Sequence, residues 1–299
     1  MTNSQNTSSD TKAGFVALIG RPNAGKSSLL NWLLGEKIAM VSHKAQATRK
    51  RLLAIVMYKN AQIIFIDTPG LHEKERLLNK FMLEEALKAI GDCDLVLFLA
   101  PVTDPIEHYE KFLKLSNKPH ILVLTKIDMV SNEELLKKIA QYQKYQDRFL
   151  ELVPVSVKKN IGKEQLLDAI VKHLPNHPYY FDPELLTTEN IREIYKELIR
   201  EAIFENVSDE IPYESDVIIE KIEESPDIDK VYAMIVVEKP TQKGIIIGKK
   251  GETLKRIGKS ARKLLEDFSG KKIYLELFVV VKKGWTKDKK EMEKIGYIF

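Results

Sequence analysis

One segment near the N-terminus most constrains what this 299-residue chain can fold into. Gly20–Ser27 fits the pattern G-x-x-x-x-G-K-S/T and lies between an apolar run, Phe15–Ile19, and a helical pattern that begins near Lys26. In such a strand–loop–helix unit, the backbone N–H groups of the loop and the positive end of the helix form a nest for phosphate. By average residue usage, the pattern arises by chance in about one chain of this length in a hundred. We therefore interpret the segment as a phosphate-binding loop.

Short apolar runs alternate with amphipathic stretches through the N-terminal half. These runs are rich in Val and Ile and nearly free of polar residues, which is typical of strands buried on both faces of a mostly parallel sheet flanked by helices. The sequence therefore predicts an α/β P-loop domain over residues 14–178. The predicted strands are Phe15–Ile19, Leu52–Tyr58, Ile63–Ile66, Leu95–Ala100, Ile121–Leu124 and Leu152–Val155.

Composition excludes several classes of protein. The longest apolar runs, such as Leu95–Ala100 and Ile245–Ile247, are too short to cross a bilayer. Residues 1–13 are polar and lack the apolar core of a signal peptide, so we expect a disordered tail and a cytoplasmic protein. The single cysteine, Cys93, cannot form an internal disulfide, and a buried core thiol is its more common role.

A second domain is predicted after a segment rich in Pro, Asn and His. We expect a linker over residues 179–189 and a domain over residues 190–299, with one phosphate-binding loop in the whole chain and no internal repeat. The predicted order is helix–strand–strand–helix–strand, which is an α+β domain. Its elements are a helix from Ile191 to Ile203, strands Asp216–Ile222 and Lys230–Val237, a helix Glu252–Phe268 and a strand Ile273–Val281.

The charge is unevenly distributed. Residues 230–299 contain 18 Lys and Arg against 8 Asp and Glu, a net charge of +10, so the rest of the chain carries −6 of the overall +4. A basic end on a mildly acidic body suggests a polyanionic partner. A solvated basic face explains the charge equally well, so charge alone does not decide between the two.

Three further motifs follow predicted strands and indicate which nucleotide is bound. Asp67–Gly70 fits D-x-x-G, in which the acid holds Mg²⁺ through water and the glycine N–H meets a γ-phosphate. Asp128 can accept both the N1–H and N2–H₂ donors of guanine, a pair that adenine lacks, while Lys126 can lie over the base. Backbone N–H groups of Val155–Val157 can close the far side of the base. These positions predict a GTP-binding enzyme that hydrolyses GTP to GDP.

The predicted nucleotide and metal ligands can be stated together. Lys26 supplies a positive charge between the β- and γ-phosphates, and Ser27 and Asp67 serve Mg²⁺. The full set predicted to contact GTP or GDP is Gly20, Arg21, Pro22, Asn23, Ala24, Gly25, Lys26, Ser27, Ser28, Asp67, Thr68, Pro69, Gly70, Leu71, Thr125, Lys126, Asp128, Ser156 and Val157.

On these motifs, with Lys44–Arg49, Asp67–His72 and the C-terminal segment described next, the chain resembles the Era family of bacterial ribosome-assembly GTPases over nearly its whole length. The resemblance implies that Thr48 is the third protein group serving Mg²⁺ and that Lys26, Thr48, Gly70 and Asn23 form the catalytic set. In related GTPases, a residue like Asn23 helps to bind K⁺ beside the phosphates. K⁺ dependence is therefore a hypothesis, with an ordinary turn asparagine as the alternative.

The sequence departs from common GTPase patterns at two positions. Leu71 stands where many GTPases have a Gln that orients the attacking water, although the Era family shares an apolar residue there. Thr125 replaces the usual Asn, and we expect it to lose the contacts that tie the base loop to the phosphate loop and to weaken GTP binding somewhat. No general base is evident, since His72 is more simply read as an exposed loop residue. Catalysis is expected to depend on positioning and charge neutralisation, and to be slow without a partner.

A G-x-x-G loop, Gly248–Gly251, lies between an apolar turn and the helix Glu252–Phe268. It resembles the KH module of the prokaryotic type (type II), which clamps the backbone of single-stranded nucleic acid. Two glycines allow a close approach of the strand, and lysines neutralise phosphates. The predicted RNA-binding residues are Ile247, Gly248, Lys249, Lys250, Gly251, Lys255 and Lys259. Trp285 is either a base-stacking side chain or, as the alternative that we favour, an anchor at the edge of the core.

By family resemblance, the expected RNA is the 3′ end of the 16S ribosomal RNA, and the expected role is assembly of the small (30S) ribosomal subunit by a monomer. The main alternative is a regulatory GTPase associated peripherally with the inner membrane, suggested by the apolar residues of the basic C-terminal stretch: Trp285, Ile295, Tyr297, Ile298 and Phe299. An RNA-processing enzyme is a second alternative, but residues 190–299 contain no second catalytic constellation.

Overall fold

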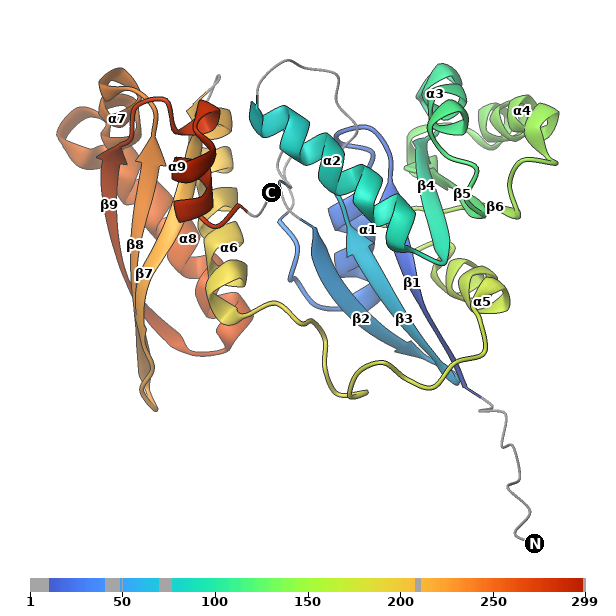
Figure 1. The fold of residues 1–299 in the computed structure, drawn as a ribbon, viewed down its shortest axis with the longest axis horizontal. Helices are drawn as coiled ribbons and strands as arrows, with labels where there is room; N and C mark the ends of the chain where they lie inside the picture. Colours follow the sequence, from blue (N-terminus) through green and yellow to red (C-terminus); the bar gives the residue numbers. More distant parts are fainter. Residues whose placement is uncertain (1–10, 41–48, 50, 70–76, 208–210, 298–299) are drawn as a thin grey trace, which may run out of the picture. The chain divides into compact units, whose positions relative to one another are not determined.

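The computed structural model describes residues 11–40, 49, 51–69, 77–207 and 211–297, with residues 77–83 described as backbone only (Figure 1). Their contacts divide them into two compact units. The N-terminal unit holds the described residues up to 36, 51–69 and 85–188. The C-terminal unit holds 37–40, 49, 77–84 and those from 189 onward.

The N-terminal unit is built on a six-stranded sheet of order β2-β3-β1-β4-β5-β6. Neighbouring strands are parallel except β2, which pairs antiparallel with β3 because a two-residue turn joins them. The predicted, mostly parallel sheet is confirmed. The strands are β1 (Lys12–Ile19), β2 (Leu52–Tyr58), β3 (Ala61–Asp67), β4 (Leu95–Pro101), β5 (His120–Thr125) and β6 (Glu151–Pro154).

Helices cover this sheet. They are α1 (Lys26–Leu34), α2 (Leu77–Asp92), α3 (Glu107–Leu115), α4 (Asn132–Tyr142) and α5 (Lys163–His173). Because successive strand residues point to opposite faces, every second apolar residue of β1, β4 and β5 packs against the end of α2 and against α3 and α4. Cys93 is buried in this cluster, as predicted, and burial raises the pKa of its thiol.

Both ends of the N-terminal unit are more ordered than the sequence predicted. β1 begins at Lys12, so residues 12 and 13, assigned to the tail, form part of the sheet. The buried Gln62 amide of β3 accepts hydrogen bonds from the backbone N–H groups of Tyr180 and Phe181, at 2.8 and 3.0 Å. Farther along, the Ile55 N–H donates to the Leu186 carbonyl at 2.8 Å. Much of the expected linker therefore packs along β2 and β3, because buried polar groups need partners.

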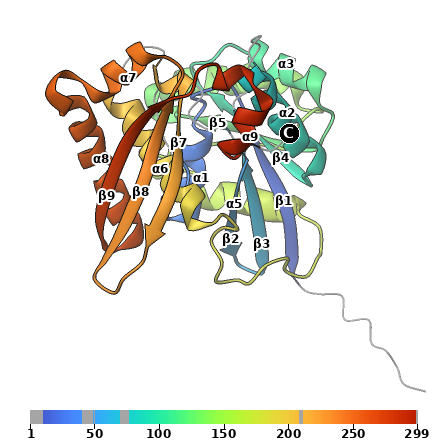
Figure 2. The same cartoon turned by 60° about the vertical axis from the view of Figure 1, so that its left-hand side comes forward.

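The C-terminal unit has a three-stranded sheet of order β7-β8-β9. The β7–β8 pair is antiparallel and the β8–β9 pair parallel. Helices α6 and α8 bury their apolar faces against one side of the sheet (Figure 2). The elements are α6 (Ile191–Asn206), β7 (Ser215–Glu223), β8 (Ile228–Val237), α7 (Pro240–Ile247), α8 (Glu252–Ser269), β9 (Lys272–Val281) and α9 (Lys289–Lys294).

Helix α7 replaces the apolar turn that the sequence predicted before the G-x-x-G loop. Pro240 occupies the first turn, where its missing N–H costs nothing. The Gln242 side chain accepts hydrogen bonds from the backbone N–H groups of Glu238 and Lys239, at 2.9 and 2.8 Å. Eight residues are too few for a periodic signal, and the apolar triplet Ile245–Ile247 at the end of α7 breaks any amphipathic pattern.

The chain after β9 builds a second small core on the opposite face of the sheet. Trp285 is 0% exposed, and its indole N–H donates to the Glu214 carbonyl at 3.2 Å. Met292, Ile295 and Tyr297 join it around Val236 of β8. Trp285 is thus a core anchor. Three of the five apolar residues that suggested a membrane surface are buried, and Ile298 and Phe299 lie outside the described residues. Among the described helices, none has the length and apolarity to span a bilayer.

Candidate nucleotide and RNA sites

The phosphate loop connects β1 to α1, and its glycines are required by its shape. A Cβ on Gly20 would lie 2.9 Å from the Leu99 carbonyl oxygen. Gly25 has φ +100°, which disfavours other residues, while the space beside it is open. Asn23 also has a positive φ, +61°. Helix α1 begins at Lys26, as predicted, so its free N–H groups face the loop.

Lys26 lies inside the loop, with 6% of its surface exposed. Its ammonium donates to the carbonyl oxygens of Gly20 and Arg21, both at 3.2 Å. Burial lowers the pKa of Lys26 to about 8, although the nearby Asp67 carboxylate opposes the shift. A buried cation in a glycine-containing loop is well suited to an anionic ligand. The negative charge of the ligand would stabilise the protonated form of Lys26, which burial destabilises.

Ser27 and Asp67 lie together. The Ser27 hydroxyl donates to Asp67 Oδ2 at 2.7 Å, which joins the start of α1 to the end of β3. Asp67 is fully buried, and the neighbouring Thr68 hydroxyl is held by the Leu18 carbonyl at 2.6 Å. A hydroxyl and a carboxylate oxygen are the hard donors that Mg²⁺ prefers, so these two residues fit the ion.

Asp128, which the sequence predicts to recognise guanine, is held by an interaction that the sequence did not predict. The Ser156 hydroxyl donates to Asp128 Oδ1 at 2.5 Å, and this hydrogen bond lowers the pKa of Asp128. Sequence reasoning used only the backbone of residues 155–157. The signal available was a buried serine at the end of a strand, which needs a partner.

The expectation for Thr125 requires correction. Its hydroxyl donates to the Ala24 carbonyl at 3.0 Å, and the Lys126 ammonium donates to the Asn23 carbonyl at 2.9 Å. The base loop is therefore tied to the phosphate loop without an asparagine amide. Threonine suffices because its Oγ1 is buried directly against the loop backbone.

Arg21 of the phosphate loop forms an unpredicted ion pair. Its Nη2 lies 2.6 Å from Asp104 Oδ1, in the segment after β4, and its Nε contacts the other carboxylate oxygen. This bidentate pair raises the pKa of Arg21. Nothing in the sequence marked Asp104, because the pairing depends on β4 lying beside β1.

The described members of the predicted set thus gather where β1, β3, β5 and β6 end. Parallel strands bring these ends to one edge of the sheet. Thr48, Gly70, Leu71 and His72 lie outside the described residues.

In the C-terminal unit, the G-x-x-G loop connects α7 to α8. Gly248 has φ +74°, and a Cβ there would lie 2.3 Å from the Thr253 hydroxyl oxygen. Gly251 has φ +81°. Lys250, between them, has φ +52°, an unusual conformation for a side chain with a Cβ. The loop is therefore a fixed, sharply bent segment.

The four predicted lysines, Lys249, Lys250, Lys255 and Lys259, are exposed. Within the described part of the chain, no ion pair involves them. Ile247 and Leu254 pack partly buried on the domain core. Gly258 of α8, which sequence reasoning did not single out, leaves only Leu277 of β9 within 4 Å of where a Cβ would stand, at 3.8 Å. A glycine in the middle of a helix was the available signal for such open space.

Comparison with known proteins finds a family match in each of the two units. Residues 15–126 match the family described as 50S ribosome-binding GTPase, and residues 198–286 match the KH domain family. The chain is 54% identical over 288 residues to GTPase Era of Campylobacter concisus, with 96% of this chain and 100% of that protein covered. It is 53% identical over 293 residues to GTPase Era of Helicobacter pylori strain G27, with 96% and 97% covered.

Solved structures agree as well. A single-residue variant of Aquifex aeolicus Era bound to GDP and AlF₄⁻ superposes with a TM-score of 0.91 at 36% identity, covering 97% of this chain and 100% of that one. An Era structure with MgGDPNP and nucleotides 1506–1542 of 16S ribosomal RNA gives the same values. The chain is 53–54% identical to Era relatives over nearly its whole length and matches both family models, and it therefore belongs to the Era family of GTPases.

Proposed function

We propose that this GTPase binds Mg²⁺-GTP at the edge of the N-terminal sheet and binds the 3′ end of the 16S ribosomal RNA through its C-terminal domain during small-subunit assembly. The observation that carries the proposal is the pairing of a buried Lys26 with a nearby Ser27–Asp67 pair in one domain and an exposed, lysine-rich G-x-x-G loop in the other. We propose a GTPase domain that covers the predicted residues 14–178 together with strand residues 12 and 13, a connecting segment 179–189 that packs on this domain, and a KH domain at 190–299, in a cytoplasmic monomer.

Each residue of the nucleotide site has a role that follows from its chemistry. Lys26 and the loop N–H groups hold the phosphates, and Asp128, oriented by Ser156, selects guanine. Ser27, Asp67 and Thr48 would hold Mg²⁺, which neutralises charge on the phosphates when bound. Gly70 would donate its N–H to the γ-phosphate. With Leu71 in place of a glutamine, the attacking water is positioned by other groups.

We also propose that hydrolysis depends on K⁺ bound near Asn23. A cation there would supply charge that an arginine finger supplies in other GTPases. The positive φ of Asn23 and the bond from Lys126 to its carbonyl hold this residue in a defined place. GTP turnover measured in K⁺ should exceed that in Na⁺, and equal rates would overturn the proposal.

For RNA, the loop Gly248–Gly251 would grip the sugar–phosphate strand, while Lys249, Lys250, Lys255 and Lys259 neutralise phosphates. Bases would lie against the apolar surface formed by Ile247 and Leu254. Replacing Lys249 and Lys250 together by alanine should flatten the plot of log affinity against log salt by about 0.7 for each phosphate that the variant no longer neutralises.

The matched control is Lys287→Ala with Lys290→Ala, which removes the same charge from exposed positions of the same domain. Titration of a fluorescent 3′-end RNA against salt distinguishes the two pairs. Equal slopes for both double variants would show that the G-x-x-G lysines do not contact the RNA.

We further propose that GTP promotes RNA binding. Ordering of the segments around Thr48 and Gly70 by Mg²⁺-GTP would make the C-terminal domain competent for RNA, and hydrolysis would reverse the change. The RNA affinity should therefore be higher with a non-hydrolysable GTP analogue than with GDP. Equal affinities would remove the coupling and leave the two binding activities independent.

A further inference from the structure

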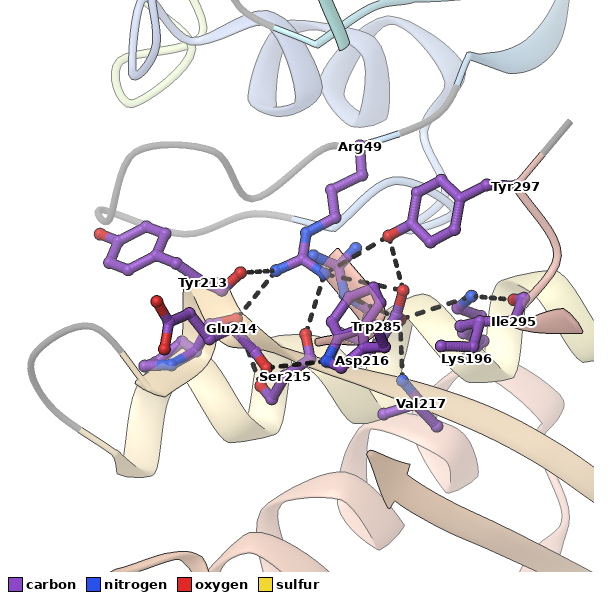
Figure 3. A network of polar contacts seen from close by, with 12 residues as sticks. Arg49, Lys196, Tyr213, Glu214, Ser215, Asp216, Val217, Trp285, Ile295 and Tyr297 are labelled. Carbon is purple, nitrogen blue, oxygen red and sulfur yellow. Dashed lines mark hydrogen bonds and ion pairs between the residues drawn. The ribbon is translucent and has the colours of Figure 1, made fainter. Parts of the chain in front are cut away.

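One buried polar cluster in the C-terminal unit has no part in either binding site (Figure 3). Asp216, at the start of β7, is fully buried. Lys196 and Arg200 of α6 approach its Oδ1 at 3.4 and 3.5 Å. Tyr297, close to the C-terminus, donates its hydroxyl to Oδ2 at 2.6 Å. These side chains all come from residues 189–299 of the C-terminal unit.

The remaining member comes from a distant part of the sequence. Arg49 is 2% exposed, and its Nη1 lies 3.6 Å from Asp216 Oδ2. Figure 3 shows the guanidinium surrounded by backbone carbonyls and the Tyr297 hydroxyl. It donates to the carbonyl oxygens of Ser215 at 2.8 Å, Tyr213 at 2.8 Å and Pro212 at 3.0 Å.

This cage is specific for an arginine. Three carbonyl acceptors and a carboxylate match the planar, five-donor guanidinium, and the Trp285 ring lies 5.9 Å from its central carbon. Burial by itself would raise the pKa of Asp216, but Lys196, Arg200 and Arg49 hold it well below its usual value. Without Arg49, Asp216 would keep Lys196 and Arg200, but the three backbone carbonyls would lose the guanidinium donor. A buried acceptor that loses its donor costs free energy, so an occupied cage is favoured.

Arg49 lies in the sequence between Thr48, a predicted Mg²⁺ ligand, and Arg51, which has its partners in the N-terminal unit. It directly follows Thr48, and two residues later Arg51 pairs with Glu85 and Asp92 in the N-terminal unit, at 3.0 and 3.1 Å. Consecutive Cα atoms are separated by about 3.8 Å, so whatever fixes Thr48 also restricts where the Arg49 backbone can be. Occupancy of the cage and the position of Thr48 are therefore linked.

We infer that Arg49 is the positioning residue that couples the nucleotide to RNA binding, by plugging the segment after Thr48 into the buried Asp216 cage of the C-terminal domain. The inference rests on the proposed function, in which Thr48 responds to Mg²⁺-GTP. A ligand that favours one position of Thr48 changes how readily Arg49 occupies its cage. The change in cage occupancy then raises or lowers the affinity of the C-terminal domain for RNA. Linkage requires that RNA change the ratio of the GTP and GDP affinities by the same factor by which the nucleotide changes the RNA affinity.

The test compares RNA affinities of the full-length protein with a non-hydrolysable GTP analogue and with GDP. Couplings of this kind are typically about 5- to 150-fold. Arg49→Ala should reduce the ratio of the two affinities to within about twofold of one. Arg51→Ala removes the neighbouring arginine, whose partners are in the N-terminal unit, and should keep the wild-type ratio.

Arg49→Ala could unfold the C-terminal domain, so two milder variants accompany it. Arg49→Lys keeps the charge but cannot satisfy three carbonyls, and Tyr297→Phe removes only the hydroxyl bound to Asp216. Thermal melts identify the folded variants. In the folded variants, the ratio of RNA affinities should fall, more for Arg49→Lys than for Tyr297→Phe. The factor by which RNA changes the ratio of GTP-analogue and GDP affinities should fall equally.

Two results separate the inference from the proposed function. A folded Arg49 variant that keeps the wild-type ratio, or loses RNA affinity equally in both nucleotide states, gives Arg49 a purely structural role and overturns the inference. A wild-type ratio of one means that GTP does not promote RNA binding, and the proposed coupling itself fails.

Discussion

The phosphate loop, Gly20–Ser27, and the G-x-x-G loop, Gly248–Gly251, each precede a helix, but the burial of their lysines differs. In the phosphate loop, Lys26 is buried and bonded to the loop carbonyls. In the G-x-x-G loop, Lys249 and Lys250 are exposed. Glycines enforce both shapes, through a close approach at Gly20 and a positive φ at Gly248.

The difference shows how one local device serves two kinds of ligand. A buried cation in an inward-facing nest is suited to a compact ligand that can fill it, and water is excluded. Exposed cations on a fixed bend are suited to a strand that passes over the surface, where affinity comes largely from counterion release. Nucleotide binding at the phosphate loop should therefore respond strongly to the loss of a single side-chain group. RNA binding at the G-x-x-G loop should respond to salt concentration and to changes in the backbone conformation of the loop.

The largest effect is expected from Lys26→Ala. Removing the charged partner of a buried phosphate costs about 2–5 kcal/mol, so GTP affinity should fall at least about 30-fold. Lys118→Ala, which removes a lysine bonded to the Gly91 and Cys93 carbonyls, is the control. Fluorescent-nucleotide titration measures both. Unchanged GTP binding by Lys26→Ala would remove the nucleotide half of the proposed function.

The next effect concerns the shape of the G-x-x-G loop. An alanine at Gly248 meets Thr253 in a conformation that costs about 1–3 kcal/mol, so RNA affinity should fall about 5- to 150-fold. Gly244→Ala, in α7 with nothing within 4 Å of the added Cβ, should leave RNA binding unchanged or stabilise the helix slightly. If both variants bind RNA like the wild type, the loop shape is irrelevant to RNA.

A pH titration distinguishes the two loops. Lys26, whose pKa burial lowers to about 8, is charged at pH 7 and increasingly neutral above pH 8. A bound phosphate raises this pKa, so nucleotide binding takes up a proton and affinity should fall up to about tenfold per pH unit above pH 8. Calorimetry in buffers of different ionisation enthalpy measures the uptake. Constant GDP affinity from about pH 7 to about pH 9.5 would contradict the burial of this charge.

The smallest effect should come from Thr125→Val, which removes the hydroxyl bound to the Ala24 carbonyl at similar volume. The loss of one such bond costs about 1 kcal/mol, so GTP affinity should fall about fivefold while guanine remains preferred through Asp128. Thr125→Ser keeps the hydroxyl and serves as the control. A Val variant that binds like the wild type would show that the tie does not support the site.

Much of the fold and of the candidate sites could be predicted because the signals are local. Six apolar runs predicted six strands, and the phosphate-loop pattern placed the start of α1 at Lys26. The misses were non-local or short. The role of Thr125 depended on which backbone lies 3.0 Å away, α7 was too short for periodicity, and Asp104 became a partner of Arg21 through strand order.

Sequence alone predicted the chemistry of the candidate sites: a loop for phosphate, a carboxylate for guanine, and a glycine bend with lysines at a basic C-terminal end. Those features reside in residue types at fixed spacing, and backbone geometry translates the spacing directly into a site. Only the tertiary structure decided where Arg49 is held, because its cage is made of carbonyls from residues 212, 213 and 215, which carry no side-chain signature. Every residue has a backbone carbonyl, so the sequence does not show which carbonyls accept hydrogen bonds from an arginine. Only the folded structure directs three of them toward one guanidinium.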